Sequence, residues 1–253
     1  MGVQLFDRMG TSTVPTEAGQ LLLLSARAIL DEANQARERI ASLNSTVSGR
    51  LRIGTSHHVG IHRLPPALRA FTVAYPDVEL DLRFLDSELA CEQVEQGELE
   101  LAVVTLPQSG NPKLLTTPVW PDPLVIVVPA GHPLTQHNKG PAPVDPIALA
   151  DHAAVLPARE TITRQILEAA LDPFQIPINV SLETNYLETI RMMVSVGLGW
   201  SVLPVAMTDD DVQALDISGV VMHRTLGIVQ QQTRTLSRAA TSFVSLLHRQ
   251  AHA

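Results

Sequence analysis

A long helical pattern of apolar residues follows the first fifteen residues of the chain. The spacings alternate between four and three, a mean of 3.5, over Leu22, Ala26, Ile29, Ala33, Ala36, Ile40 and Leu43. This period is typical of helices that pair as a left-handed coiled coil. Thr16 suits the N-cap of such a helix. An amphipathic helix lying on its own domain is the alternative, but the small alanines would let a partner approach closely. We therefore predict a dimerisation helix over residues 16–44.

Beyond a polar, breaker-rich stretch at residues 44–49, strand patterns alternate with helical ones. The expected strands are residues 50–54, 78–84, 99–104, 124–128, 153–156, 178–182, 200–203 and 220–222. The expected helices are residues 64–75, 87–96, 161–171, 188–196 and 237–249. This alternation predicts an α/β fold with mainly parallel sheets. The continuous apolar run Leu124–Val128 suits a buried parallel strand. This series of elements is too long for one compact doubly wound lobe, so we expect two lobes.

Composition narrows the classes of protein. The chain has 253 residues, 45% of them hydrophobic, which suffices for a sizeable core. A net charge of −8 disfavours attraction of the whole chain to nucleic-acid phosphates. The single cysteine, Cys91, excludes an intramolecular disulfide framework and suits the cytoplasm. The longest apolar stretch, residues 192–207, is too short and broken for a membrane span, and the first 20 residues lack a signal-peptide pattern. We expect a cytoplasmic protein with no membrane association.

A series of short motifs also runs along the chain. They are GVQLFDR (residues 2–8), PTEAG (15–19), GRLRIG (49–54), LP (64–65), Phe71, YP (75–76), GELELAVV (97–104), PLVIVVP (123–129), HPL (132–134) and VSVGLGWSVLP (194–204). In this order and spacing they resemble the LysR-type transcriptional regulators over essentially the whole chain. Pro15 and Glu100 depart mildly from the family pattern, which has Leu and Asp there.

This resemblance implies an architecture. It predicts two Rossmann-like lobes, similar to type II periplasmic binding proteins, behind a linker helix and the remnant of a winged helix-turn-helix. The implied divisions are the wing at 1–15, the linker at 16–44, lobe I at 45–120 with 227–253, and lobe II at 121–226. The family places its recognition helix before Gly2, so the sequence resembles a regulator lacking most of that domain.

The resemblance also implies a DNA-binding transcriptional regulator. Its partners would be operator DNA in the intact protein, a small-molecule co-inducer, further copies in a homodimer or homotetramer, and RNA polymerase. Residues 5–8 and 12–14 would form the wing, with Arg8, Thr11 and Ser12 on the DNA backbone. Effector binding and oligomerisation would remain in the present chain. The alternative is a solute-binding protein of the same fold, which would need an export signal and no coiled-coil-like helix.

Four loops at the carboxyl ends of predicted strands are the candidate effector site, because ligands of open α/β lobes gather there. The candidates are Thr55, Ser56, His57, Thr105, Arg159, Thr161, Thr184 and Asn185. Hydroxyl and free N–H groups can hold an anion, and Arg159 can clamp a carboxylate. The alternatives are helix caps, including Thr161 or Thr163 for the third helix, and a solvated arginine at position 159. We expect a small carboxylate or another anion.

No enzyme, cofactor or metal is expected. The chain shows no nucleophile motif, P-loop or dinucleotide-binding glycine pattern. His58 and His62 could share a helix face as metal ligands, but no acidic residue or cysteine lies near them in sequence, so surface or cleft histidines are favoured. Cys91 has glutamates around it and no cation to stabilise a thiolate, which disfavours a redox sensor.

Overall fold

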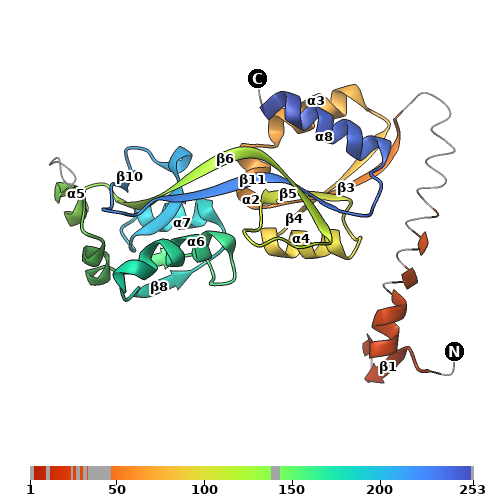
Figure 1. Cartoon of the computed structure of the whole chain (residues 1–253), viewed down its shortest axis with the longest axis horizontal. Helices are drawn as coiled ribbons and strands as arrows, with labels where there is room; N and C mark the ends of the chain where they lie inside the picture. The colour runs from red at the N-terminus through yellow and green to blue at the C-terminus, as the bar shows by residue number, and fades with distance from the viewer. Residues whose placement is uncertain are drawn as a thin grey trace.

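The computed structural model contains an N-terminal hairpin, a helical segment and two α/β lobes (Figure 1). It describes residues 3–9, 12–23, 25–26, 29–30, 33, 47–137 and 143–251. The expected α/β class and the two lobes are confirmed. No helix within these ranges is both long and apolar enough to cross a bilayer.

The N-terminal hairpin pairs β1 (Phe6–Met9) with β2 (Ser12–Pro15) in antiparallel register. Thr16 follows directly, and its hydroxyl oxygen accepts a hydrogen bond from the N–H of Gly19 at 3.1 Å while donating to the carbonyl of Gln4 at 2.7 Å. Both the expected hairpin and the cap at Thr16 are therefore confirmed. The structure describes the backbone of Arg8 and Ser12, whereas Thr11 lies outside the described residues.

The linker segment is helical at residues 17–23 and at the described positions beyond, as far as Ala33. Leu22 and Ala26 are half-buried, whereas Ile29 and Ala33 are exposed. Three of the predicted pairing positions, Ala36, Ile40 and Leu43, lie outside the described residues.

The first lobe is built on a sheet in which β3 (Gly49–Thr55) lies between its parallel neighbours β4 (Val78–Phe84) and β5 (Leu101–Thr105). Side chains of β5 alternate between the two faces, as the strand period requires. On one face Leu101 and Val103 join the core under α3 (Pro65–Ala74) and α8 (Arg238–Ala251). On the other, Ala102 and Val104 pack against α4 (Ser87–Glu95), so the sheet is covered on both sides.

The second lobe contains the parallel pair β7 (Ala154–Leu156) and β8 (Val180–Glu183). Its other elements are α5 (Pro133–His137), η1 (Pro146–Asp151), α6 (Ile162–Leu171), η2 (Asp172–Phe174), α7 (Leu187–Ser195), β9 (Ser201–Pro204), η3 (Val205–Met207) and β10 (Val212–Leu215). Trp200 is fully buried at its centre. Its indole N–H lies 3.2 Å from the carbonyls of both Leu149 and His152, so this large side chain keeps its polar atom satisfied.

Two long strands, β6 (Leu114–Pro129) and β11 (Met222–Gln231), cross between the lobes side by side (Figure 1). They pair antiparallel over ten residues of β11, with a register shift between Leu226 and Gly227. A side chain at Gly227 would meet the carbonyl of Thr117 at 2.3 Å, so the close approach of the two strands requires glycine.

The prediction of mainly parallel sheets is wrong, and so is the direction predicted for Leu124–Val128. In the seven-stranded sheet β3 pairs parallel with β4 and β5, whereas the other named pairings are antiparallel. The segment Leu124–Val128 belongs to β6, which pairs antiparallel with β9, β10 and β11. A continuous apolar run indicates that both faces of a strand are buried. An antiparallel strand in the middle of a sheet can be buried in the same way, so the pattern does not determine the strand direction. The strand expected at 220–222 begins only at Met222 and continues to Gln231, and β10 was not predicted.

The contact of α3 with α8 yields a stability prediction. Phe71 is fully buried, with ring centroids 5.0 Å from Tyr75 and 5.3 Å from Phe243. Phe71→Ala should lower the free energy of unfolding by about 3–5 kcal/mol, because it leaves a cavity between the helices. Urea unfolding followed by circular dichroism measures the change. Val73→Ala is the matched control, since Val73 of the same helix is 79% exposed. Similar losses in both variants would contradict the assignment of this core.

Candidate functional site

A polar pocket lies where the two lobes face one another. One wall consists of the end of β5 and the N-terminal ends of α2 (His57–His62) and α4. The opposite wall consists of the N-terminal ends of α6 and α7, and β11 contributes Arg224. The cavity volume is about 50 Å³, which is room for a few water molecules or a small ligand.

Hydrogen bonds across this pocket hold the lobes together. The carboxylate of Glu88, from α4, accepts a bond from the backbone N–H of Ile162, the first residue of α6, at 2.7 Å. The side-chain amide of Asn185 donates to the carboxylate of Asp86 at 2.8 Å and accepts from the N–H of Ala158 at 3.0 Å. The bonds of Glu88 and Asp86 tie the start of α4 in one lobe to the start of α6 and to the loop before α7 in the other, whereas the bond between Asn185 and Ala158 lies within the second lobe.

Arg224 is the arginine of the pocket. It is 6% exposed, and it donates to Asp122 at 2.7 Å and to the hydroxyl of Thr163 at 2.8 Å. Its Nη2 atom has no hydrogen-bond partner among the described residues. Burial lowers the pKa of this guanidinium, while the charge of Asp122 opposes that effect. Arg63 also approaches Asp122, at 3.4 Å, so the carboxylate is shared by two cations. A buried guanidinium with a spare N–H group is suited to bind an anion.

The structure brings five of the predicted effector residues to this pocket. They are Ser56, His57, Thr105, Thr161 and Asn185. A neighbouring hollow is lined by Thr184, again with Asn185. Thr161 is also the N-cap of α6, since its hydroxyl accepts from the N–H of Arg164 at 3.3 Å, so Thr161 and not Thr163 is the cap.

The other two candidates lie elsewhere. Thr55 is fully buried, does not line the pocket, and donates its hydroxyl to the carbonyl of Val103 at 2.9 Å. Arg159 is exposed and lines neither hollow. The loop expected after Thr55 is also shorter than predicted, because α2 begins at His57.

Sequence reasoning missed several pocket residues. Asp86, Ser87 and Glu88 follow the end of β4, so the rule that selected the other loops could have found them. Thr163 was considered as a helix cap and not as part of the site. Arg224 lies inside a strand, where no local signal marks a ligand-binding residue.

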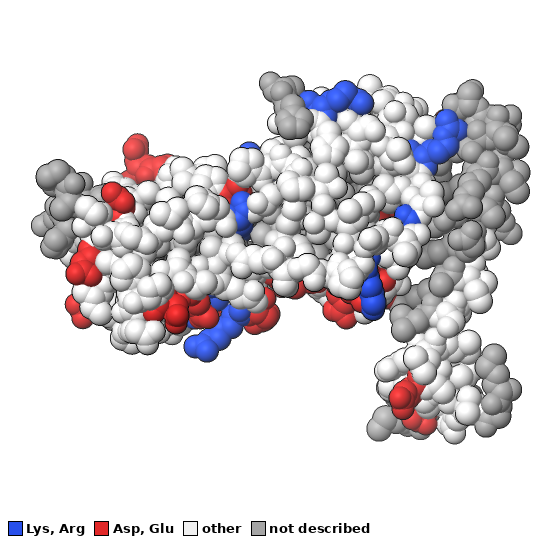
Figure 2. Space-filling view, viewed as in Figure 1, with Lys and Arg blue, Asp and Glu red and all other residues white. Residues whose placement is uncertain are grey.

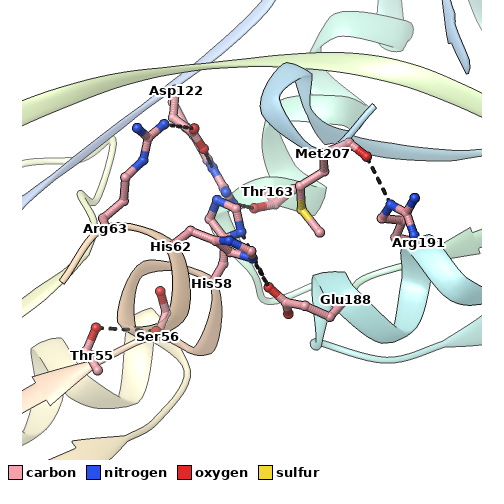
Figure 3. Close-up of polar contacts among 11 residues, drawn as sticks. Thr55, Ser56, His58, His62, Arg63, Asp122, Thr163, Glu188, Arg191 and Met207 are labelled. Atoms are coloured by element: carbon pink, nitrogen blue, oxygen red, sulfur yellow. Dashed lines mark hydrogen bonds and ion pairs between the residues drawn. The ribbon is translucent and has the colours of Figure 1, made fainter. Parts of the chain in front are cut away.

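A second polar group lies beside the pocket. Glu188, in the first turn of α7, has its carboxylate 3.6 Å from Nδ1 of His58 and 3.1 Å from Nε2 of His62 (Figure 3). The distance to His62 is that of a hydrogen bond, whereas the distance to His58 is longer. The pKa of Glu188 is lowered to about 2, because the nearby imidazoles of His58 and His62 favour the carboxylate more than its partial burial disfavours it.

Basic side chains do not gather into one patch on the face of the lobes seen in Figure 2, where Lys and Arg residues are scattered and acidic ones lie mainly at the left end and along the lower edge. This distribution agrees with the net charge of −8 and gives the visible face little attraction for a phosphate backbone.

Comparison with known families confirms the resemblance seen in the sequence. The model of the LysR substrate binding domain matches residues 44–252. A probable RuBisCO transcriptional regulator from Nostoc sp. (strain PCC 7120 / SAG 25.82 / UTEX 2576) is 28% identical over 257 residues, covering 96% of this chain and 74% of the relative. An uncharacterized HTH-type transcriptional regulator, YybE from Bacillus subtilis (strain 168), is 25% identical over 245 residues, covering 96% of this chain and 82% of the relative.

Solved structures share the fold. The regulatory domain of CcmR from Synechocystis PCC6803, in complex with 2-PG, has a TM-score of 0.70 and 24% identity, over 80% of this chain and 97% of that one. A full-length OxyR variant from Pseudomonas aeruginosa has a TM-score of 0.71 and 25% identity, over 99% of this chain and 80% of that one. The effector-binding domain of QuiR in complex with shikimate has a TM-score of 0.69 and 18% identity, over 81% of this chain and 98% of that one. The two lobes are thus of the type II periplasmic-binding-protein kind that the sequence predicted.

Cys91 is buried on α4, next to the pocket wall. Burial raises the pKa of its thiol to about 11, and the carboxylate of Glu88 adds to the rise. A thiol with so high a pKa is a poor nucleophile at neutral pH.

The pKa of Cys91 predicts its reactivity. At pH 8 the folded protein should react with iodoacetamide at least about a hundredfold more slowly than the urea-unfolded chain, because the two-unit shift leaves about a hundredfold less thiolate. The rate should rise with pH up to about pH 11. Mass spectrometry of quenched samples measures both. Equal rates in the folded and unfolded chain would exclude this environment for Cys91.

Proposed function

Since the chain belongs to the LysR family, we propose that it acts as a transcriptional regulator that senses a small anionic effector in the pocket between its lobes. The relatives named above as transcriptional regulators support the regulatory role. Domains of the same fold are solved with small ligands, 2-PG in CcmR and shikimate in QuiR, which supports a sensing role for the pocket. We propose sensing and not catalysis for this site.

The environment of Arg224 is the main support for an anionic effector. Its guanidinium is buried at the pocket, is fixed by Asp122 and Thr163, and keeps Nη2 without a hydrogen-bond partner among the described residues. Leaving a buried donor unpaired costs about 1–3 kcal/mol, which a bound carboxylate or other oxyanion would recover. The small cavity favours a ligand of few atoms.

We further propose that residues 45–120 with 227–253 form one functional lobe and residues 121–226 the other. The hydrophobic clusters support this division at every position but Leu226, which packs in the core of the first lobe. Two clusters draw their buried members from residues 51–114 and 226–247, and two from residues 124–222. An effector that touches both groups would favour one relative arrangement of the lobes over another, which is how a ligand shifts a conformational equilibrium.

The assembly and DNA-binding roles are extensions of the same proposal. Exposed apolar side chains on the linker helix, including Leu21, Ile29 and Leu30, support pairing with a second copy as a dimer or within a tetramer. Contacts of Arg8, Thr11 and Ser12 with the DNA backbone, an interaction with RNA polymerase, and a place in the cytoplasm follow from a role at operator DNA.

The effector proposal predicts the outcome of a thermal-shift screen with small carboxylates and phosphate esters. At least one anion should raise the melting temperature of the wild-type chain, because ligands that bind the native state stabilise it. Arg224→Lys keeps a positive charge beside Asp122 but cannot present the same planar fork, so it should weaken that anion about tenfold in calorimetric titration. The matched control is Arg159→Lys, which should bind as wild type because Arg159 lies outside the pocket.

No stabilisation by any anion would contradict the anionic class of effector. Weakened binding in the control variant, with unchanged binding in Arg224→Lys, would move the anion site to the loop at position 159.

The pairing proposal predicts the effect of a charge on the linker helix. Ile29 is 69% exposed, and Ile29→Glu should dissociate the oligomer, because the buried carboxylate would lack a partner in an apolar interface. Light scattering after size-exclusion chromatography measures the mass. Val73→Glu, at an exposed position of α3, should leave the mass unchanged. A wild-type chain that elutes as a monomer at all concentrations would refute pairing.

A further inference from the structure

Three potential metal ligands from the two lobes meet beside the pocket. His58 and His62 lie four residues apart on α2, and Glu188 lies on α7. Their ligand atoms all fall within 4.8 Å of one another, and the ring centroids of the two histidines are 4.9 Å apart (Figure 3). Within the described part of the chain, no other group of three or more His, Cys, Asp or Glu side chains brings its ligand atoms this close together.

His58 provides an independent indication of a ligand. It is 6% exposed, and neither ring nitrogen has a hydrogen-bond partner among the described residues. The carboxylate of Glu188 lies 3.6 Å from its Nδ1 atom, which is beyond ordinary hydrogen-bond length. Buried polar atoms without partners are rare because they cost desolvation energy. A metal ion bound to one of these nitrogens would supply that atom with a partner and so reduce the cost.

The local fold holds the histidines toward α7. A side chain at Gly60 would meet the ring of Phe84 at 2.4 Å, so glycine lets α2 pack directly against the end of β4. The spacing of four then places His58 and His62 on one face of the helix, as in other helical zinc sites. Glu188 is held opposite by its position in the first turn of α7.

We propose that His58, His62 and Glu188 form a binding site for a divalent transition-metal ion such as Zn²⁺, which bridges the two lobes. Two imidazoles and one carboxylate are a ligand set that Zn²⁺ accepts, with a fourth position for water or another ligand. Ca²⁺ and Mg²⁺ prefer oxygen ligands and should bind weakly. Tetrahedral Zn²⁺ needs ligands at about 2.0–2.2 Å, so the group must contract on binding. His62 and Glu188 are 45% and 34% exposed, which leaves them free to turn inward.

The site would couple the metal to the cleft. Its ligands come from both sides of the interface, so a bound ion stabilises the arrangement of the lobes in which the three side chains meet. His58 also lines the effector pocket, which makes the affinities for metal and effector interdependent, and such coupling is reciprocal. The metal site itself does not depend on the proposed function, because it can be measured without any effector.

Calorimetric titration of the 253-residue chain with ZnCl₂, after treatment with EDTA and desalting, tests the site. The wild-type chain should bind one Zn²⁺. His62→Gln and Glu188→Gln should each weaken that binding by more than about tenfold. Removing even a group that only hydrogen-bonds to a metal ligand typically lowers the affinity by about tenfold or more, and these variants remove a ligand itself. His152→Gln is the matched control, because His152 pairs with His132 in another histidine contact, with ring centroids 4.5 Å apart. It should bind as tightly as the wild type.

Co²⁺ absorption provides a second readout on the unaltered protein. Binding to the three side chains should produce the intense visible bands of a low-coordinate ion, and Zn²⁺ should displace them. Because His62 is half-exposed, His62→Gln should keep the circular dichroism of the wild type, so a loss of metal in that variant cannot be attributed to unfolding.

Wild-type binding of Zn²⁺ that persists in both His62→Gln and Glu188→Gln would overturn the site, as would the absence of Zn²⁺ binding and of the Co²⁺ bands. Loss in His62→Gln with full affinity in Glu188→Gln would overturn the bridge between the lobes. Equal weakening in His152→Gln would show binding by surface histidines and would also refute the proposal.

Discussion

The pairing of β6 with β11 is the interaction on which the rest of the molecule depends. These strands are the backbone connection shared by both lobes, and their antiparallel ladder satisfies the main-chain groups that would otherwise be buried without partners. Arg224 lies on β11 and Asp122 faces it from β6 in the same register, so the ladder itself fixes the charged pair at the pocket. Any change of register would separate the guanidinium from its carboxylate.

Local patterns predicted most of the elements, because in them periodicity and burial coincide. The strand at Val78–Phe84 alternates apolar and polar residues, and it forms with those bounds. The first half of β6 was missed for the opposite reason. It contains Pro118, Pro121 and Pro123, which normally argue against a strand. Among the residues that the structure describes, residues 114–123 pair with β11 alone, and a strand with one unpaired edge tolerates prolines. Neither that unpaired edge nor the strand direction is encoded in a local pattern.

The pocket was predictable only where it depends on the ends of strands. Ser56, Thr105 and Asn185 were found because loops at the carboxyl ends of strands converge in α/β folds. Contacts between residues distant in sequence could not be inferred in the same way. Glu188 lies 126 residues from His62, so the sequence offered no acidic partner for the histidines and favoured the interpretation without metal. The fold supplies that carboxylate by placing α7 opposite α2.

The hydrogen bond between Glu88 and the N–H of Ile162 affects the ligand concentration at which a sensor built on this pocket would respond. A carboxylate attached to the opposite wall behaves as a resident competitor, with an effective concentration on the order of millimolar or higher. A dissolved anion can bind the first N–H of α6 only by displacing the Glu88 carboxylate. At low concentration, only ligands that also make contacts elsewhere in the pocket can do so. At concentrations below that value, simple anions would leave the bond between Glu88 and α6 intact.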